Sequence, residues 1–179
     1  MKILQRLLFW ALTALLVASC GTAYQENRQR RAAEKAAEHA AIVRAIEAGD
    51  FILDVTQIIP RGFPSRTSTG EYQLRLEGDV VTTRLPFLGV SYQAPNYGDN
   101  DDLSIVFEKE RVTVYRDDSK VASKGEYCFQ FKGGKGQHPW TVTLYVFDSG
   151  AATIQCSNTG SRYMSYHANL VIPEKNENQ

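Results

Sequence analysis

The chain has 179 residues, and its 20 lysines and arginines balance 20 aspartates and glutamates. This near-neutral composition argues against a nucleic-acid-binding protein, which needs an excess of basic side chains. The 9 tyrosines, 8 phenylalanines and 13 glycines favour strands and turns over helices. The length is sufficient for one domain with a hydrophobic core.

Residues 1–19 have the features of a secretory signal peptide. Lys2 and Arg6 precede a short apolar run over residues 7–18, and the small residues before Cys20 form a cleavage site. This order is typical of a cleaved signal peptide, and a cysteine directly after the cleavage site is typical of a bacterial lipoprotein. We therefore predict cleavage before Cys20 and lipidation of its thiol. Ordinary secretion and an uncleaved anchor are the alternatives, although the run is shorter than the ~20 residues that span a membrane.

The residues after Cys20 indicate where the lipid anchor would lie. Gly21 follows the cysteine, where an aspartate would indicate retention in an inner membrane. The first acidic residue is Glu26, which is later than surface display would favour. We therefore predict an outer-membrane lipoprotein, with the periplasmic face favoured over the cell surface.

An alanine-rich helix is predicted between the anchor and the rest of the chain. Residues 20–27 are polar and are expected to form a tether, and residues 28–49 combine many alanines with alternating charges. Alanine has the highest helix propensity, and Gly49 is suited to end a helix. Three apolar residues lie near its end: Ile42, Val43 and Ile46. We favour a spacer over a partner-binding helix because an alanine-rich face is only weakly hydrophobic.

The pattern changes to period two in residues 50–173, which predicts strands. Nine strands are expected, at residues 51–56, 72–77, 81–87, 104–108, 112–116, 127–131, 140–147, 152–157 and 164–172. Gly78-Asp79 predicts a hairpin turn, and the short connections favour antiparallel neighbours. The predicted fold is mainly β, an antiparallel β-sandwich or flattened barrel of about nine strands preceded by one N-terminal helix. Residues 174–179 form a polar tail.

One block of the chain resembles a known family. The block over residues 85–98 reads Leu-Pro-Phe-Leu-Gly-Val-Ser-Tyr-Gln-Ala-Pro-Asn-Tyr-Gly and leads into the strand Ile-Val-Phe at 105–107. It resembles domain of unknown function family 4251, whose members are small envelope lipoproteins of Gram-negative anaerobes. The later strand over residues 141–146 and residues 151–154 are also similar to the family. The resemblance implies an all-β domain with a helical lead, and it implies no activity and no catalytic residues.

We find no catalytic, metal or cofactor motif. His39, His138 and His167 do not have the spacing of metal ligands. The acidic run over residues 99–102 lacks the glycine and glutamate of a calcium loop, and Gly133-Gly134-Lys135-Gly136 reads as a hairpin tip. No Gly-x-Ser-x-Gly motif is present. We therefore predict that the protein is not an enzyme and uses no cofactor.

Cys128 and Cys156 remain after lipidation of Cys20. An oxidising envelope permits a disulfide between them, but strand alternation places Cys128 on a polar face and Cys156 with the core residues. Opposite faces of one sheet cannot be bridged, because the two Cβ atoms must lie about 3.8 Å apart. We keep both alternatives for this pair, although the strand alternation argues against a disulfide.

Two long loops contain aromatic residues that could form a contact surface. Phe63 lies in the first loop, and Tyr92, Tyr97 and Asp99 lie in the second. Aromatic anchors among polar neighbours are typical of binding surfaces. We therefore expect a non-catalytic binding or scaffolding module whose partner is an envelope protein or a glycan, with an undetermined oligomeric state. The alternatives are a barrel-type carrier of a small apolar ligand and, less favoured, a periplasmic hydrolase.

Overall fold

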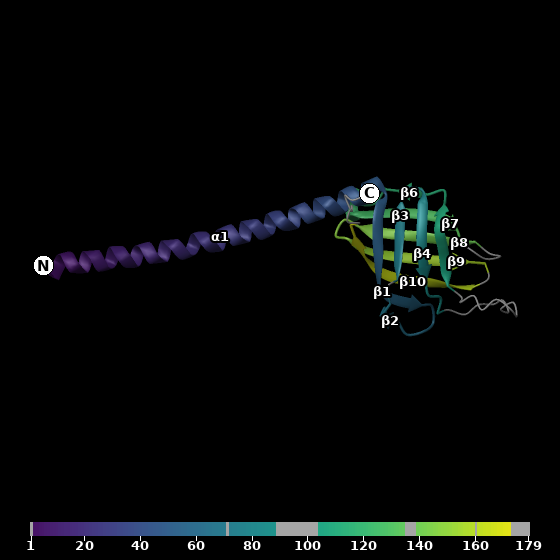
Figure 1. The fold of residues 1–179 in the computed structure, drawn as a ribbon, viewed down its shortest axis with the longest axis horizontal. Helices are drawn as coiled ribbons and strands as arrows, with labels where there is room; N and C mark the ends of the chain where they lie inside the picture. Colours follow the sequence, from purple (N-terminus) through teal and green to yellow (C-terminus); the bar gives the residue numbers. More distant parts are fainter. Residues whose placement is uncertain (1, 71, 89–103, 135–138, 160, 173–179) are drawn as a thin grey trace, which may run out of the picture. The chain divides into compact units, whose positions relative to one another are not determined.

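The computed structural model describes residues 2–70, 72–88, 104–134, 139–159 and 161–172 (Figure 1). For residues 2–24, 161 and 162 the description is confined to the backbone. The chain divides into two compact units, Met1–Ala40 and Ala41–Gln179. The second unit contains the whole β-sheet.

The helix α1 runs from Lys2 to Ala48 without a break. It therefore begins before residue 28, and the residues expected to form a tether (20–27) are helical. Leucines before this segment and alanines after it favour the helix on both sides, since both residues have high helix propensity. The predicted end of the helix is confirmed: Gly49 has a φ of 66°, and its N–H donates to the carbonyl of Ile46 at 3.1 Å, as in a left-handed helix stop.

The last two turns of α1 are part of the β unit. Ile46 is fully buried, and Ile42 and Ala45 pack against the same core. Ile42 approaches Gly150 so closely that a Cβ at Gly150 would lie 3.2 Å from Ile42 Cδ1. The apolar patch near the helix end therefore covers the domain's own core, and the β unit begins at Ala41, not at residue 50.

In the described part of the chain, ten strands form a single sheet in which every pair is antiparallel. Their bounds are β1 Asp50–Pro60, β2 Arg66–Thr67, β3 Gln73–Glu77, β4 Val80–Leu85, β5 Ile105–Arg111, β6 Tyr115–Asp117, β7 Glu126–Gly133, β8 Trp140–Phe147, β9 Ala151–Asn158 and β10 Ser161–Val171. The strand order is β5-β4-β3-β1-β10-β9-β8-β7-β6, and β2 pairs with β1. A short helix, α2 (Val121–Lys124), precedes β7.

The predicted mainly β fold with one N-terminal helix is confirmed, with two differences in the strands. The two-residue strand β2 lies where no periodic pattern predicted a strand. The strand expected over residues 112–116 is reduced to β6, because the N–H of Val112 donates to the carbonyl of Asp79 at 2.8 Å and Val112 turns into the core.

The sheet curls so that its two halves face each other across the core. The rings of Phe51 on β1 and Phe129 on β7 lie 5.5 Å apart, although three strands separate β1 from β7 in the sheet. Phe107 on β5 contacts Phe131 on β7, with ring centroids 5.7 Å apart. In Figure 1, β1, β3 and β4 cross the layer formed by β7–β10. The interior is therefore occupied by aromatic side chains from both halves.

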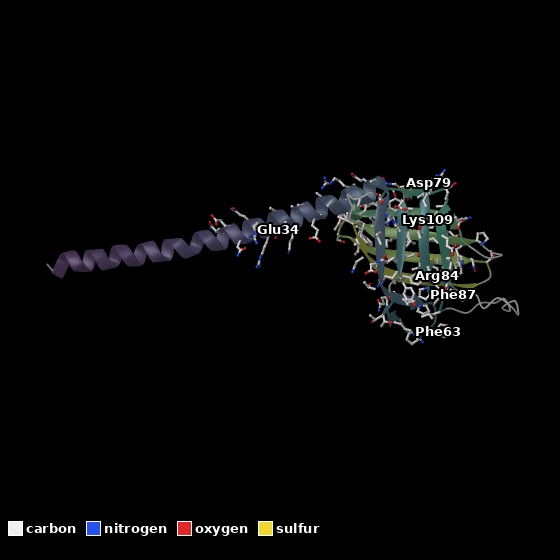
Figure 2. The ribbon with its side chains drawn as sticks, viewed as in Figure 1. Glu34, Phe63, Asp79, Arg84, Phe87 and Lys109 are labelled. Carbon is white, nitrogen blue, oxygen red and sulfur yellow. The ribbon has the colours of Figure 1, made fainter. Side chains whose placement is uncertain are left out.

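The strand register defines two ends of the sheet. Asp50, Glu77 and Val80 are neighbours at the end where α1 enters, which we call the helix end. Pro60 closes β1 and Leu85 closes β4 at the other end, which we call the loop end. Figure 2 shows Asp79 near the first end, with Phe63, Phe87 and Arg84 toward the second.

Candidate functional site

Phe63 is held in an exposed position by a tight turn at the loop end. Its N–H donates to the carbonyl of Pro60 at 3.3 Å, and Gly62 between them has a φ of 85°. A positive φ at this position is typical of a type II turn, and glycine adopts it without strain. The Phe63 side chain is 50% exposed, which makes it an apolar projection on a defined backbone.

The loop that carries Phe63 is braced on both sides. The N–H of Ser68 donates to the carbonyl of Thr56 at 2.9 Å. Gln57 Nε2 donates to Ser65 Oγ at 3.3 Å, and Gln57 is also the partner of Thr67 in the β1–β2 pair. These contacts restrict the loop before any partner arrives, which lowers the entropic cost of binding.

A second exposed apolar side chain lies at the loop end, after β4. The Tyr166 hydroxyl donates to the carbonyl of Pro86 at 2.9 Å, and the ring of Phe87 packs against Trp140 at 5.5 Å. With Phe87 buried, the next side chain, Leu88, points outward and is 38% exposed. The sequence interpretation missed Leu88, although the alternation around Phe87 could have indicated it.

Of the four predicted contact residues, Phe63 lies in the described part of the chain and the other three do not. Phe63 is at the loop end, as described above. Tyr92, Tyr97 and Asp99 lie outside the described residues, in the segment between Leu88 and Ser104. β4 ends at Leu85 and β5 begins at its partner Ile105, and both residues are at the loop end. That the loop of Phe63 and the loop of Tyr92 form one contact surface stays a prediction.

The charged side chains in the described segments around Phe63 are basic. Arg61 and Arg66 flank the turn, and Arg84 is on β4; all three are exposed. Arginine beside an aromatic residue is a common combination at binding surfaces. In the described part of the loop end, the arrangement can therefore bind a partner by apolar contact and by hydrogen bonds from guanidinium groups.

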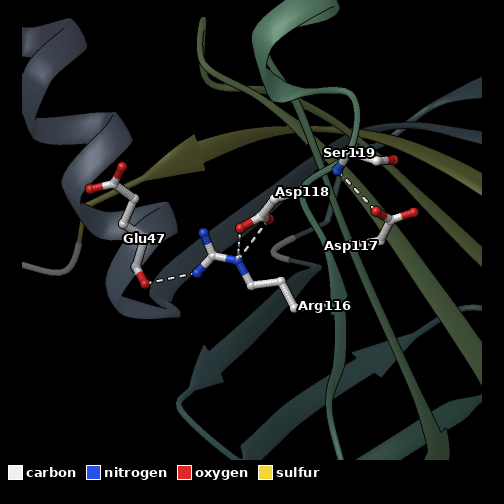
Figure 3. Close-up of polar contacts among 5 residues, drawn as sticks. All are labelled: Glu47, Arg116, Asp117, Asp118 and Ser119. Atoms are coloured by element: carbon white, nitrogen blue, oxygen red, sulfur yellow. Dashed lines mark hydrogen bonds and ion pairs between the residues drawn. The ribbon is translucent and has the colours of Figure 1, made fainter.

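The helix end is built around Arg116, which sequence reasoning also missed (Figure 3). Its Nη1 donates to the carbonyl of Glu47 at 2.9 Å, and its Nε donates to both carboxylate oxygens of Asp118 at 2.8 and 2.9 Å. Its guanidinium lies 5.6 Å from the ring centre of Tyr127 and 5.5 Å from that of Phe129. A cation at a helix C-terminus compensates unpaired carbonyls, so this cluster attaches α1 to the sheet.

Asp117, beside this cluster, stabilises the turn that follows β6. The N–H of Ser119 donates to Asp117 Oδ1 at 2.9 Å (Figure 3). This hydrogen bond lowers the pKa of the Asp117 carboxyl, since it favours the ionised form. The role of Asp117 is local and structural.

Cys128 and Cys156 are free thiols on strands separated by β8. Cys156 is fully buried in the core, whereas Cys128 is half-buried and alternates with the inward-facing Tyr127 and Phe129. Burial raises the pKa of both thiols. Neither is therefore a ready nucleophile, because the thiolate is the reactive form.

The described residues show no metal centre. Among them, no group of three or more His, Cys, Asp and Glu side chains is placed to hold a metal ion. His167 is exposed on β10, His39 lies on α1, and His138 is outside the described residues.

The anchor residue Cys20 lies within α1, and its side chain is not described. Lipidation of Cys20 therefore stays a prediction. Over the described residues, no helix combines the length and apolarity needed to cross a membrane.

The fold and the loop-end surface define a small β domain built from one curled antiparallel sheet with a helical lead. The chain belongs to the DUF4251 family, a domain of unknown function, whose family model matches residues 33–170. This match confirms the resemblance seen in the block over residues 85–98. No curated protein is significantly similar to the chain.

A solved structure supports the same fold. It is a DUF4251 family protein from Bacteroides eggerthii DSM 20697, and it is 16% identical to this chain with a TM-score of 0.51. The similarity covers 78% of this chain and 91% of the other. At this level of identity the similarity establishes the fold alone.

Proposed function

We propose that the protein is an outer-membrane lipoprotein that acts as a non-catalytic binding or scaffolding module, with its contact surface at the loop end. The observation that carries the contact surface is Phe63, which is 50% exposed on a turn that its own backbone hydrogen bonds fix. Exposed aromatic residues on a preorganised backbone are favoured as anchors for partners. An envelope protein or a glycan is the expected partner.

The lipid anchor rests on the sequence of residues 1–20. The basic start, the apolar run and the small residues before Cys20 support cleavage and lipidation. More than one acyl chain holds a protein firmly on a membrane, because each buried CH₂ contributes about 0.8 kcal/mol. We favour the periplasmic face because the first acidic residue after Cys20 is Glu26.

We rank a carrier of a small apolar ligand below a binding module. Three aromatic pairs contact across the interior, with ring centroids 5.5, 5.5 and 5.7 Å apart. Side chains in such contact fill the space between the two halves of the sheet, as in a packed core.

The contact surface is tested by crosslinking in intact cells, with a photoreactive residue at position 63 or at position 171. Val171 is a matched control, since it is 45% exposed but lies at the helix end. We expect a specific crosslinked product from position 63 and none from position 171. Phe63→Ala should lower recovery of that partner about tenfold, the loss typical of an aromatic anchor, and Val171→Ala should not. Equal recovery from the two variants would exclude the loop end as the contact surface.

A further inference from the structure

Uncharged polar side chains occupy the middle of the outer surface of strands β7–β10. Strand alternation turns the apolar residues of these strands into the core. Six of the residues between them lie on the outer side of the sheet, and we call them the polar face: Gln130, Thr143, Tyr145, Thr153, Gln155 and the buried Ser165.

The strand register arranges these side chains in rows. Gln130, Thr143, Gln155 and Ser165 are consecutive partners across β7, β8, β9 and β10, and Tyr145 and Thr153 are partners in the next row. Adjacent strands lie about 4.8 Å apart, so hydroxyl and amide groups recur at that spacing. Gln130 Nε2 donates to Thr143 Oγ1 at 3.3 Å, which orders the start of the row.

The other half of the same sheet is different, because its outer surface is charged. Arg75 and Glu77 on β3 form an ion pair at 2.6 Å, and Arg84 and Lys109 are exposed on β4 and β5. In the described part of β7–β10, the charged side chains Glu126 and Lys132 lie on β7, at the margins of the polar face. Within the polar face, Gln130 is exposed and Thr143, Tyr145, Thr153 and Gln155 are half-buried, whereas Ser165 is buried.

The chemistry of the polar face selects one kind of partner. A strongly charged partner would find no counter-charge at its centre, and an apolar partner would leave the amides and hydroxyls of Gln130, Thr143 and Gln155 unpaired. A sugar chain offers hydroxyl groups that pair with amides and hydroxyls and C–H faces that pack on an aromatic ring such as Tyr145. We propose that the polar face binds an extended, neutral glycan chain.

This inference is independent of the loop end and of the lipid anchor. Phe63 lies on the turn after β1, whereas the polar face lies on β7–β10. Failure to capture a partner through Phe63 would not contradict glycan binding by the polar face. Failure of the polar face to bind a glycan would not contradict a contact surface at the loop end.

The test is native affinity electrophoresis of the full-length protein in gels that contain a neutral β-glucan, a neutral xylan or anionic alginate. We expect a neutral polysaccharide to retard the protein and alginate not to retard it. Gln155→Glu, which keeps the side-chain shape but adds a charge, should weaken the affinity about tenfold or more, and so should Tyr145→Ala. Thr82→Ala, on the outer surface of β4, is the matched control and should bind as the wild type does, and so should Phe63→Ala.

Four results would overturn the proposal. One is the absence of retardation by either neutral polysaccharide, and another is retardation by alginate alone. The third is unchanged binding by both Gln155→Glu and Tyr145→Ala when their thermal unfolding shows that they are folded. The fourth is a dimer of the wild-type protein that Gln155→Glu dissociates, which would assign the polar face to a second copy of the chain.

Discussion

Arg116 joins three parts of the domain through one side chain. It contacts the carbonyl of Glu47 at the end of α1, the carboxylate of Asp118, and the rings of Tyr127 and Phe129. The ion pair itself contributes little, since both partners are partly exposed. The helix carbonyl and the ring contacts carry most of the expected stabilisation.

Arg116→Ala should therefore lower the free energy of unfolding by about 1–2 kcal/mol, through loss of the helix-end contact and the cation–π contacts. Urea unfolding measures this change. Arg75→Ala is the control, because Arg75 forms an exposed pair with Glu77 and its loss should cost about 0.5 kcal/mol or less. Equal losses for the two variants would show that Arg116 has no special role.

The buried thiol of Cys156 predicts a pH dependence of stability. Burial raises the pKa of Cys156 far above its ordinary value of 9.0, so the folded thiol stays neutral while the unfolded thiol ionises. The free energy of unfolding should therefore fall as the pH rises above 9.0, since ionisation then favours the unfolded chain. Cys156→Ala should reduce this slope in urea unfolding measured between pH 8 and about 10; an unchanged slope would contradict the account.

Cys128 and Cys156 also predict a labelling pattern. In the folded protein, a maleimide should label Cys128 slowly and leave Cys156 unlabelled, because only Cys128 is partly exposed and burial raises its pKa. In denaturant, both should be labelled, as mass spectrometry would show. Failure to label either thiol in denaturant without a reductant would reveal a disulfide.

At the scale of the element, the end of α1 is a structural part of the β unit. Ile46 is fully buried, whereas Val43 on the same turn is only half-buried. Ile46→Ala should therefore cost about 2–5 kcal/mol, as for other buried isoleucines, while Val43→Ala should cost about 1 kcal/mol or less. Urea unfolding of the two variants measures the difference. A chain that loses residues 41–49 without loss of stability would refute this role of α1.

The elements that the sequence predicted are those with local signals. Alternating apolar residues predicted the long strands, and Gly49 and Gly78 predicted the helix stop and the hairpin, where their φ values are 66° and 62°. The elements that it did not predict depend on distant contacts. β2 is a strand only because Thr67 pairs with Gln57, and no local pattern marks a two-residue strand.

The candidate site also combines features that have local sequence signals with features that depend on distant contacts. The loop of Phe63 was predicted from the lack of periodicity in residues 62–70, which is a local signal. The contact of Arg116 with Glu47 joins residues 69 positions apart, and the polar face depends on the register of four strands. Neither arrangement follows from sequence periodicity, because periodicity indicates which side chains share a face of a strand and not which strands are neighbours.

At the scale of the molecule, the β unit has different chemistry on its different surfaces. α1 covers one end of the core through Ile46, the loop end presents Phe63 and Leu88, and the polar face on β7–β10 is uncharged. The sequence that would carry the lipid joins the unit at the helix end.

The central claim is that the protein is lipid-anchored through Cys20. It is tested most directly by mass spectrometry of the N-terminal peptide of the protein isolated from the outer-membrane fraction. The account predicts a peptide that begins at Cys20 and carries acyl chains, and it predicts that Cys20→Ala is either left unprocessed or released from the membrane. An N-terminal peptide without lipid, or a Cys20→Ala variant that is membrane-bound at mature size, would contradict it.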